Sequence, residues 1–283
     1  MSQKSYDNSP TLYLIPTPIG NMEDITLRAV KTLELVEAVF CEDTRVTGLL
    51  LNHLGIKKKM IANHEHNEEN NRKKIIEYLS NGFNVGLVSD RGTPIISDPG
   101  YELSRYIIES GYNVVSLPGA TALIPALTSS GIAPMPFLFY GFLNSKNSKR
   151  EKELENLKNE VSTLIFYESP HRIEDTLKSL GKILGLNRKI SISREITKKF
   201  EEVYRGTIEE IIKENNEYKG ELVVVVSGNS KTAGFESLTL LDHINLYIND
   251  GMNKMDAIKI VSKERGLKKS EVYNEYLKYE ERK

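Results

Sequence analysis

The sequence predicts an α/β fold with two α/β domains followed by a small helical domain. Through residues 11 to about 131, short apolar runs alternate with amphipathic stretches, which is typical of a largely parallel sheet covered by helices. A second series of strand-like and helix-like segments begins at Phe137, after a stretch rich in Gly and Pro. Residues 238–283 have the pattern of three short helices. We therefore expect domains at residues 1–131, 132–230 and 231–283.

The strands expected in the first domain are short apolar runs, and the first, fourth and fifth of them end in loops of Pro, Gly and small polar residues. They lie at residues 11–16, 37–41, 59–63, 84–88 and 113–117. Between the first two, apolar residues from Ile25 to Val36 recur at helical spacing, with Asp24 as the expected cap. Another helix is expected from Glu68 to Leu79 and should stop near Gly82.

The second domain is expected to be a mixed sheet. Its strands are expected at residues 137–141, 162–167, 189–193, 201–206 and 221–226, and its helices at 148–159, 171–184 and 207–215. Because the strands at 189–193 and 201–206 are separated by a short connection, we expect them to pair antiparallel. The continuous apolar run at 221–226 indicates a buried central strand.

The end of the chain is expected to be a separate helical unit. Residues 227–236 are small and polar and are typical of a linker. Beyond them, residues 255–273 have a helix, Gly turn and helix cadence similar to helix-turn-helix units.

Composition and charge indicate a soluble globular protein. Of the 283 residues, 39% are hydrophobic and 27% charged. The net charge of −1 gives no overall field that attracts nucleic acid, so such binding would depend on local basic patches. The single cysteine, Cys41, excludes an intramolecular disulfide and fits a reducing compartment. With no signal peptide and no apolar run of about 18 residues, the expected location is the cytoplasm.

Three loops follow the expected strands of the first domain and suggest a small-molecule site. They are residues 16–21 (PTPIGN), 89–100 (SDRGTPIISDPG) and 118–121 (PGAT). In open α/β sheets, ligands bind beyond the carboxyl ends of the strands. The first loop lacks the G-x-G-x-x-G fingerprint, and its prolines remove amide donors that would bind phosphate. A tight β–α turn with no ligand is the alternative interpretation.

The second loop contains two aspartates with different expected roles. Asp90 directly follows a strand, where a carboxylate can accept hydrogen bonds from ribose hydroxyls or attract a cation. Gly92 allows the backbone to approach a ligand closely. Asp98 precedes Pro99 and Gly100 and is expected to cap the next helix.

Two further strand ends carry side chains suited to chemistry. Residues 42–45 (EDTR) could contribute to a site, or form a local ion pair and a helix cap. Residues 167–172 (YESPHR) include His171, which could act as a base or simply begin a helix. No Cys and His spacing indicates a metal site, and no G-x-S-x-G motif is present.

Basic residues cluster at 57–59, 146–152 and 188–189. Such clusters are usually solvated surface. Residues 254–283 add nine Lys and Arg against six Asp and Glu, which allows a polyanionic partner.

These motifs together resemble the tetrapyrrole methylase superfamily of S-adenosylmethionine-dependent methyltransferases, and more closely its rRNA-modifying branch. The matching segments are residues 16–21, 24–29, 42–45, 89–100, 118–120, 167–172 and 194–198, in the expected order. The porphyrin-modifying branch opens with a Gly-rich loop where this chain has Pro-Thr-Pro. One departure is Arg91, where the family usually has a small residue.

The resemblance implies that the cofactor lies in a cleft between the two α/β domains, that the product is S-adenosylhomocysteine and that no metal takes part. It implies methylation of a cytidine ribose 2′-oxygen in the decoding region of 16S rRNA in the small ribosomal subunit, by a homodimer. The implied cofactor contacts are Pro18, Gly20, Asp90, Gly92, Thr93, Pro94, Gly119, Ala120, Thr121, Tyr167, Leu222 and Val223. Candidate bases are Asp43, Glu168 and His171. Arg45 and Arg172 are the candidates for positioning RNA, because a guanidinium binds phosphate bidentately.

Two other functions remain open at this point. One is a methylase of a small macrocycle, which the Pro-Thr-Pro loop and the basic helical tail argue against. The other is a non-catalytic module that uses the cofactor fold to bind RNA or a protein.

Overall fold

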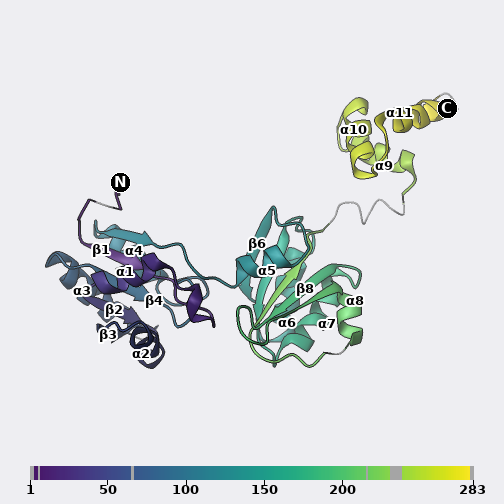
Figure 1. Ribbon diagram of the computed structural model, residues 1–283. Helices are drawn as coiled ribbons and strands as arrows, with labels where there is room; N and C mark the ends of the chain where they lie inside the picture. The colour runs from purple at the N-terminus through teal and green to yellow at the C-terminus, as the bar shows by residue number, and fades with distance from the viewer. Residues whose placement is uncertain (1–2, 6, 65–66, 215, 230–237, 281–283) are drawn as a thin grey trace.

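The computed structural model describes residues 3–5, 7–64, 67–214, 216–229 and 238–280 (Figure 1). In this part of the chain, five parallel strands form the first sheet, in the order β3-β2-β4-β1-β5. The strands are β1 (Thr11–Leu14), β2 (Ala38–Cys41), β3 (Lys59–Ala62), β4 (Val85–Val88) and β5 (Asn113–Ser116). The five strands and their parallel arrangement confirm the sequence prediction.

Helices cover both faces of the first sheet, which explains why its strands are apolar on both sides. They are α1 (Leu27–Leu35), α2 (Thr44–His53), α3 (Glu68–Ser80) and α4 (Tyr101–Glu109). Val39 of β2 packs with Leu33 of α1 on one face, and the neighbouring Phe40 packs with Ile75 of α3 on the other. The alternation follows from the two-residue period of a strand.

Two expected helix caps are wrong. The hydroxyl of Thr26 accepts from Ala29 N at 3.0 Å and caps α1, whereas Asp24 lies in a short turn, η1 (Met22–Asp24). The helix α4 begins after Gly100, whose φ of 123° suits glycine, so Asp98 lies outside the helix and does not cap it.

The second sheet is mixed, in the order β6-β7-β10-β8-β9. Its strands are β6 (Phe137–Phe142), β7 (Thr163–Glu168), β8 (Lys189–Arg194), β9 (Glu202–Thr207) and β10 (Leu222–Val226). The strands β8 and β9 pair antiparallel and the fully buried β10 lies at the centre, which confirms both expectations.

Helices also cover both faces of the second sheet. The helices α6 (Asn147–Leu157), α7 (Ile173–Leu184) and α8 (Ile208–Glu214) share a core with Val224 of β10. The helix α5 (Leu123–Ser129) shares the opposite core with Val223 and Val225. Figure 1 shows α5 beside the second sheet although it precedes residue 131. The domain boundaries at 131 and 230 stay predictions.

Three helices follow near the end of the chain, α9 (Leu240–Asn249), α10 (Lys254–Glu264) and α11 (Lys269–Glu280). They pack around Ile244, Ile258, Val261 and Val272. Residues 230–237, which include most of the expected linker, lie outside the described residues. Among the described helices, none has the length and hydropathy needed to cross a membrane.

Candidate active site

The three loops at the carboxyl edge of the first sheet form one connected wall. Thr17 and Gly92 exchange two backbone hydrogen bonds, of 2.9 and 3.0 Å. The hydroxyl of Ser89 donates to Gly92 O at 3.1 Å, which closes the second loop on itself. Thr93 Oγ1 donates to Ala120 O at 3.0 Å and joins the second loop to the third. The three loops are therefore fixed relative to one another without a ligand.

Two glycines allow these loops to approach closely. Gly92 has a φ of 80°, and a Cβ added there would lie 3.2 Å from Ile19 Cγ2. A Cβ on Gly119 would lie 2.5 Å from Pro16 Cβ, a distance that side chains do not adopt. Both positions therefore require the absence of a side chain.

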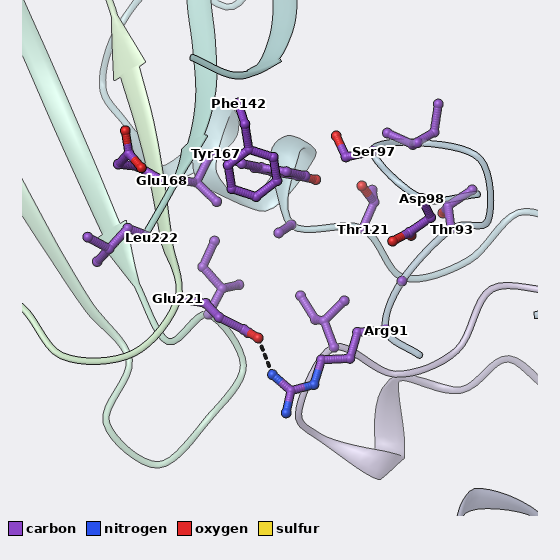
Figure 2. Close-up of a pocket in the computed structure, with 16 residues that line it drawn as sticks. Arg91, Thr93, Ser97, Asp98, Thr121, Phe142, Tyr167, Glu168, Glu221 and Leu222 are labelled. Carbon is purple, nitrogen blue, oxygen red and sulfur yellow. Dashed lines mark hydrogen bonds and ion pairs between the residues drawn. The ribbon is translucent and has the colours of Figure 1, made fainter. Parts of the chain in front are cut away.

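A cavity of about 230 Å³ opens between this wall and the second domain (Figure 2). The first-domain side is lined by Ile19, Arg91, Gly92, Thr93, Ile96, Ser97, Asp98, Thr121 and Ala122, and the second-domain side by Phe142, Tyr167, Glu168, Ile196, Glu221, Leu222 and Val223. An adjoining hollow of about 550 Å³ shares Ile19, Thr121 and Ile196 with it and reaches Gly119 and Ala120.

The structure brings most of the expected cofactor residues to these two hollows. Gly92, Thr93, Thr121, Tyr167, Leu222 and Val223 line the cavity, and Gly119, Ala120 and Thr121 line the adjoining hollow. Of the other four, Pro18 and Pro94 lie in the same loops but line neither hollow in the described part of the chain. Gly20 packs against the aliphatic stem of Lys198. Asp90 Oδ1 accepts from Asp43 N at 3.0 Å and so shapes the turn after β2.

Polar contacts connect the two domains at the edge of the cavity. Arg91 forms an ion pair with Glu221, as Figure 2 shows. Glu221 also accepts from Lys198 Nζ at 2.8 Å. The hydroxyl of Thr197 donates to Asp24 beside the adjoining hollow. Arg91, the departure from the family pattern, thus contacts an acidic residue of the opposite domain.

Asp98 is a cavity residue whose role the sequence analysis misassigned. Burial, with smaller effects of Glu42 and Asp90, raises its pKa from 3.8 to about 6. Burial likewise raises the pKa of Tyr167, against the effect of a hydrogen bond with Thr121, and the charge of Asp98 adds to the rise. The Asp-Pro-Gly string looked like a helix start, and only the three-dimensional loop shows that the carboxylate faces the cavity.

Asp43 and Arg45 form a local pair at the start of α2. Asp43 caps the helix by accepting from Arg45 N at 2.8 Å, and Arg45 Nε lies 3.0 Å from the same oxygen. These hydrogen bonds lower the pKa of Asp43 to about 2. The side chain of Arg45 is 89% exposed. The geometry is that of the ion pair and cap considered as the alternative for this motif.

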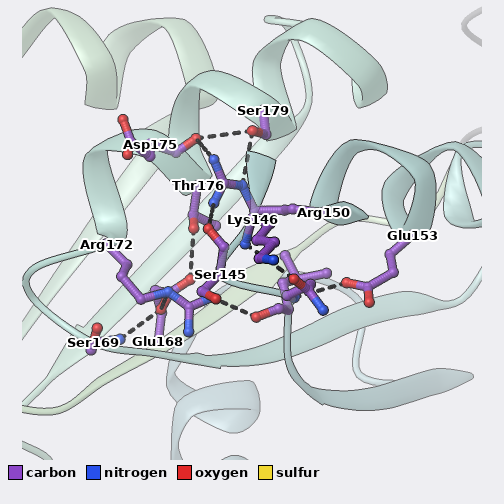
Figure 3. A network of polar contacts seen from close by, with 12 residues as sticks. Ser145, Lys146, Arg150, Glu153, Glu168, Ser169, Arg172, Asp175, Thr176 and Ser179 are labelled. Atoms are coloured by element: carbon purple, nitrogen blue, oxygen red, sulfur yellow. Dashed lines mark hydrogen bonds and ion pairs between the residues drawn. The ribbon is translucent and has the colours of Figure 1, made fainter. Parts of the chain in front are cut away.

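Glu168 and Arg172 belong to a polar network between β7 and α7 (Figure 3). Glu168 is 3% exposed and accepts from Ser169 N at 2.8 Å and from Thr176 Oγ1 at 2.6 Å. Arg172 Nε lies 3.4 Å from Glu168 Oε1, and its Nη2 donates to Leu143 O. Both side chains are occupied by contacts within the domain, whereas His171 is exposed. Their roles as bases or RNA contacts stay predictions.

The cavity walls suit a ligand that is partly flat and apolar and partly polar. Phe142 and Tyr167 lie edge to face with ring centroids 5.7 Å apart, and Leu222 and Val223 add aliphatic surface. Thr93, Ser97 and Thr121 supply hydroxyls, and Asp98 a carboxylate. No group of three or more metal-ligating side chains occurs within the described ranges.

Comparisons with known proteins identify the family. The family model described as tetrapyrrole (corrin/porphyrin) methylases matches residues 11–212. The ribosomal RNA small subunit methyltransferase I of Bacillus subtilis (strain 168) is 46% identical over 98% of this chain and 97% of its own. Its namesake from Haemophilus influenzae (strain ATCC 51907 / DSM 11121 / KW20 / Rd) is 44% identical over 94% and 96%.

Solved structures show the same fold. The methyltransferase CobJ superposes with a TM-score of 0.60 at 18% identity, over 78% of this chain and 95% of its own. A cobalamin biosynthetic enzyme, cobalt precorrin-4 methyltransferase, gives 0.57 at 16% identity, over 77% and 94%. The expected fold class is confirmed. With its two α/β domains, its interdomain cavity and its full-length similarity to these relatives, the chain belongs to the tetrapyrrole methylases, in the group of the ribosomal RNA small subunit methyltransferase I.

Proposed function

We propose that this protein transfers a methyl group from S-adenosylmethionine to 16S rRNA, at the ribose 2′-oxygen of a cytidine in the decoding region. The observation that supports the proposal most strongly is the fraction of this chain that aligns with each group of relatives. The solved structures of cobalt precorrin-4 methyltransferase and of the methyltransferase CobJ cover 77–78% of the chain, whereas the relatives named as ribosomal RNA methyltransferases cover 94–98%. The similarity to the rRNA methyltransferases therefore extends beyond the part of the chain that is shared with these two solved structures.

The interdomain cavity fits S-adenosylmethionine by the chemistry of its walls. The rings of Phe142 and Tyr167 and the aliphatic side chains of β10 suit the flat adenine. The hydroxyls of Thr93 and Thr121 suit the ribose and the amino-acid end. The wall does not depend on a row of free amide donors such as a pyrophosphate needs, because Thr17 N and Gly92 N already bond to each other's carbonyls.

When bound, the sulfonium group of the cofactor makes the methyl group electrophilic. The main task of the chain is then to hold the ribose oxygen in line, for which positioning can supply up to about 7–11 kcal/mol. Arg45, exposed at the start of α2 in the first domain, is the proposed contact to an RNA phosphate. Asp43, Glu168 and His171 remain the proposed bases, although a pKa of about 2 makes Asp43 a weak proton acceptor.

The proposed partner is the small ribosomal subunit in the cytoplasm, and the proposed product of the cofactor is S-adenosylhomocysteine. A homodimer is the proposed assembly, on the basis of the family resemblance.

The test is methyl transfer from radiolabelled S-adenosylmethionine to small subunits that lack the modification, followed by nuclease digestion to locate the label. Subunits that already carry the modification, naked 16S rRNA and a porphyrinoid acceptor serve as controls. Label on the ribose of a decoding-region cytidine supports the proposal. Label on the porphyrinoid would establish a macrocycle methylase, and cofactor binding without transfer to any acceptor would establish a binding module.

A matched pair of variants connects the activity to the cavity. Gly92→Ala and Gly111→Ala introduce the same strain, because the two glycines have φ values of 80° and 87°. An added Cβ at Gly92 meets Ile19 in the cavity wall, whereas at Gly111 nothing lies within 4 Å. We expect Gly92→Ala to weaken cofactor binding at least tenfold and Gly111→Ala to leave it unchanged.

A further inference from the structure

Asp98 lines the interdomain cavity from an unusually shaped loop. Ile95 and Ser97, the two residues flanking Ile96, have φ values of 78° and 65°. This left-handed region is unfavourable for side chains other than glycine, above all for a β-branched residue such as Ile95. Strained backbone of this kind is found where a loop presents functional groups.

The loop is held in this shape by packing on both sides. Ile95 packs against the first-domain core. A Cβ on Gly100 would lie 2.9 Å from Leu87 Cδ2 and 3.4 Å from Ile95 Cγ1, so the backbone there lies directly on the core. Ser97 and Asp98, between these two anchors, line the cavity, where Figure 2 shows them on the side of Thr93 and Thr121.

No cation of the protein pairs with Asp98 in the described part of the chain. The titratable groups that act on it are Glu42 after β2 and Asp90 after β4, which are both acidic, and Tyr167 of β7 across the cavity. Of the cations nearby, Arg91 pairs with Glu221 of the second domain, and Arg45 pairs with Asp43. A hydrogen bond with Ser89 favours the ionised carboxylate, but burial and the two like charges outweigh it, so a cation supplied from outside would stabilise this charge.

We propose that Asp98 is the counter-ion for a positively charged group of the bound cofactor, and that the loop at residues 93–100 holds its carboxylate in the cavity for this purpose. The proposal rests on the proposed function, because the cation is the sulfonium or the α-ammonium of S-adenosylmethionine. Asp98 thereby contributes to cofactor binding and to the choice of a cationic ligand.

The proposal gives binding a definite pH dependence. Only the ionised carboxylate attracts a cation, and burial raises the pKa of Asp98 to about 6. Cofactor affinity should therefore be full at pH 7.5 and should fall as the pH drops through 6 toward 5.5. Bound cation in turn favours the ionised form, so binding at pH 6 should release protons to the buffer.

The experiment measures the affinity of the full-length protein for S-adenosylmethionine and S-adenosylhomocysteine by calorimetry, at pH 7.5 and 5.5. Asp98→Asn removes the charge at nearly constant shape. Asp175→Asn is the control, because Asp175 on α7 has a side chain that is 71% exposed. Circular dichroism confirms that both variants are folded.

We expect Asp98→Asn to weaken S-adenosylmethionine binding about tenfold or more at pH 7.5 and to abolish the pH dependence, with Asp175→Asn unchanged. A loss confined to S-adenosylmethionine assigns the contact to the sulfonium, and an equal loss for both ligands assigns it to the ammonium. Wild-type affinity in Asp98→Asn overturns the proposal, and if methyl transfer then falls, Asp98 is a base. If the wild type binds neither ligand, the proposed function itself fails.

Discussion

Glu168→Gln tests whether Glu168 accepts a proton in the reaction or holds β7 to α7. The side chain is 1% exposed, and its two oxygens accept from different donors, Ser169 N at 2.8 Å and Thr176 Oγ1 at 2.6 Å. An amide keeps one of these acceptors and replaces the other by an NH₂ group. It also removes the negative charge beside Arg172, whose Nε lies 3.4 Å away.

The expected cost follows from these contacts. A hydrogen bond to a charged acceptor contributes about 1.5–3 kcal/mol, and a buried donor left without a partner costs a similar amount. We therefore expect Glu168→Gln to lower the free energy of unfolding by about 2–3 kcal/mol. With a urea m-value of about 2 kcal/mol/M, the midpoint of the transition should fall by about 1 M.

The assay is urea unfolding followed by circular dichroism, with methyl transfer measured on the same preparations. Glu174→Gln is the matched control, because Glu174 is exposed in the first turn of the same helix and should change stability by less than about 0.5 kcal/mol. If Glu168→Gln unfolds like the wild type but transfers methyl groups at least 10²-fold more slowly, Glu168 is a base and the structural interpretation is refuted.

Three further predictions concern the cavity and its surroundings. Arg45→Ala should weaken binding to the small subunit and reduce the salt dependence of that binding by about one phosphate contact. It should leave the unfolding midpoint unchanged, because the side chain is 89% exposed. Equal affinity and an equal salt slope in a filter-binding titration would exclude the contact. Gly119→Ala should lower both the thermal stability and the cofactor affinity, because the added Cβ would lie 2.5 Å from the rigid ring of Pro16. Scanning calorimetry with and without the cofactor measures the stability and the affinity. Asp98→Asn should stabilise the cofactor-free protein at pH 7.5 by about 1–2 kcal/mol, after a shift of pKa from 3.8 to about 6 is discounted for partial solvent screening. The carboxyl of the unfolded chain loses its proton near pH 4 and that of the folded protein near pH 6, so the stability of the wild type falls as the pH rises from 4 to 6. The extra stability of the variant should therefore vanish at pH 4, which denaturation at several pH values checks.

The sequence determined the secondary structure of the two sheets because their strands are strongly marked. Most of the expected strands contain a short apolar run, and every expected strand is a strand in the structure. Runs buried on both faces, such as 38–41, predict a parallel sheet covered by helices, and the order of the chain then brings the loops after β1, β4 and β5 to one edge. The local sequence pattern was sufficient to predict these strands, because the residues that determine each strand lie within about a dozen positions of one another.

The local pattern was insufficient where two residues competed for one role. Asp24 and Thr26 are both good capping residues, and the structure selects Thr26 because the helix begins at Leu27. The same ambiguity misassigned Asp98, since an Asp before Pro and Gly looks like a helix start whichever way its side chain points.

The tertiary structure alone decided which side chains meet across the cavity. Arg91 and Glu221 are 130 residues apart in the chain, and their ion pair exists only because the two domains face each other. Packing against the core fixes the loop that turns Asp98 toward Tyr167, whereas Glu168, one residue further along β7, points into the network with Thr176. Burial, charge and hydrogen bonding come from the neighbours that folding supplies, so the sequence could name the site residues but could not assign their roles.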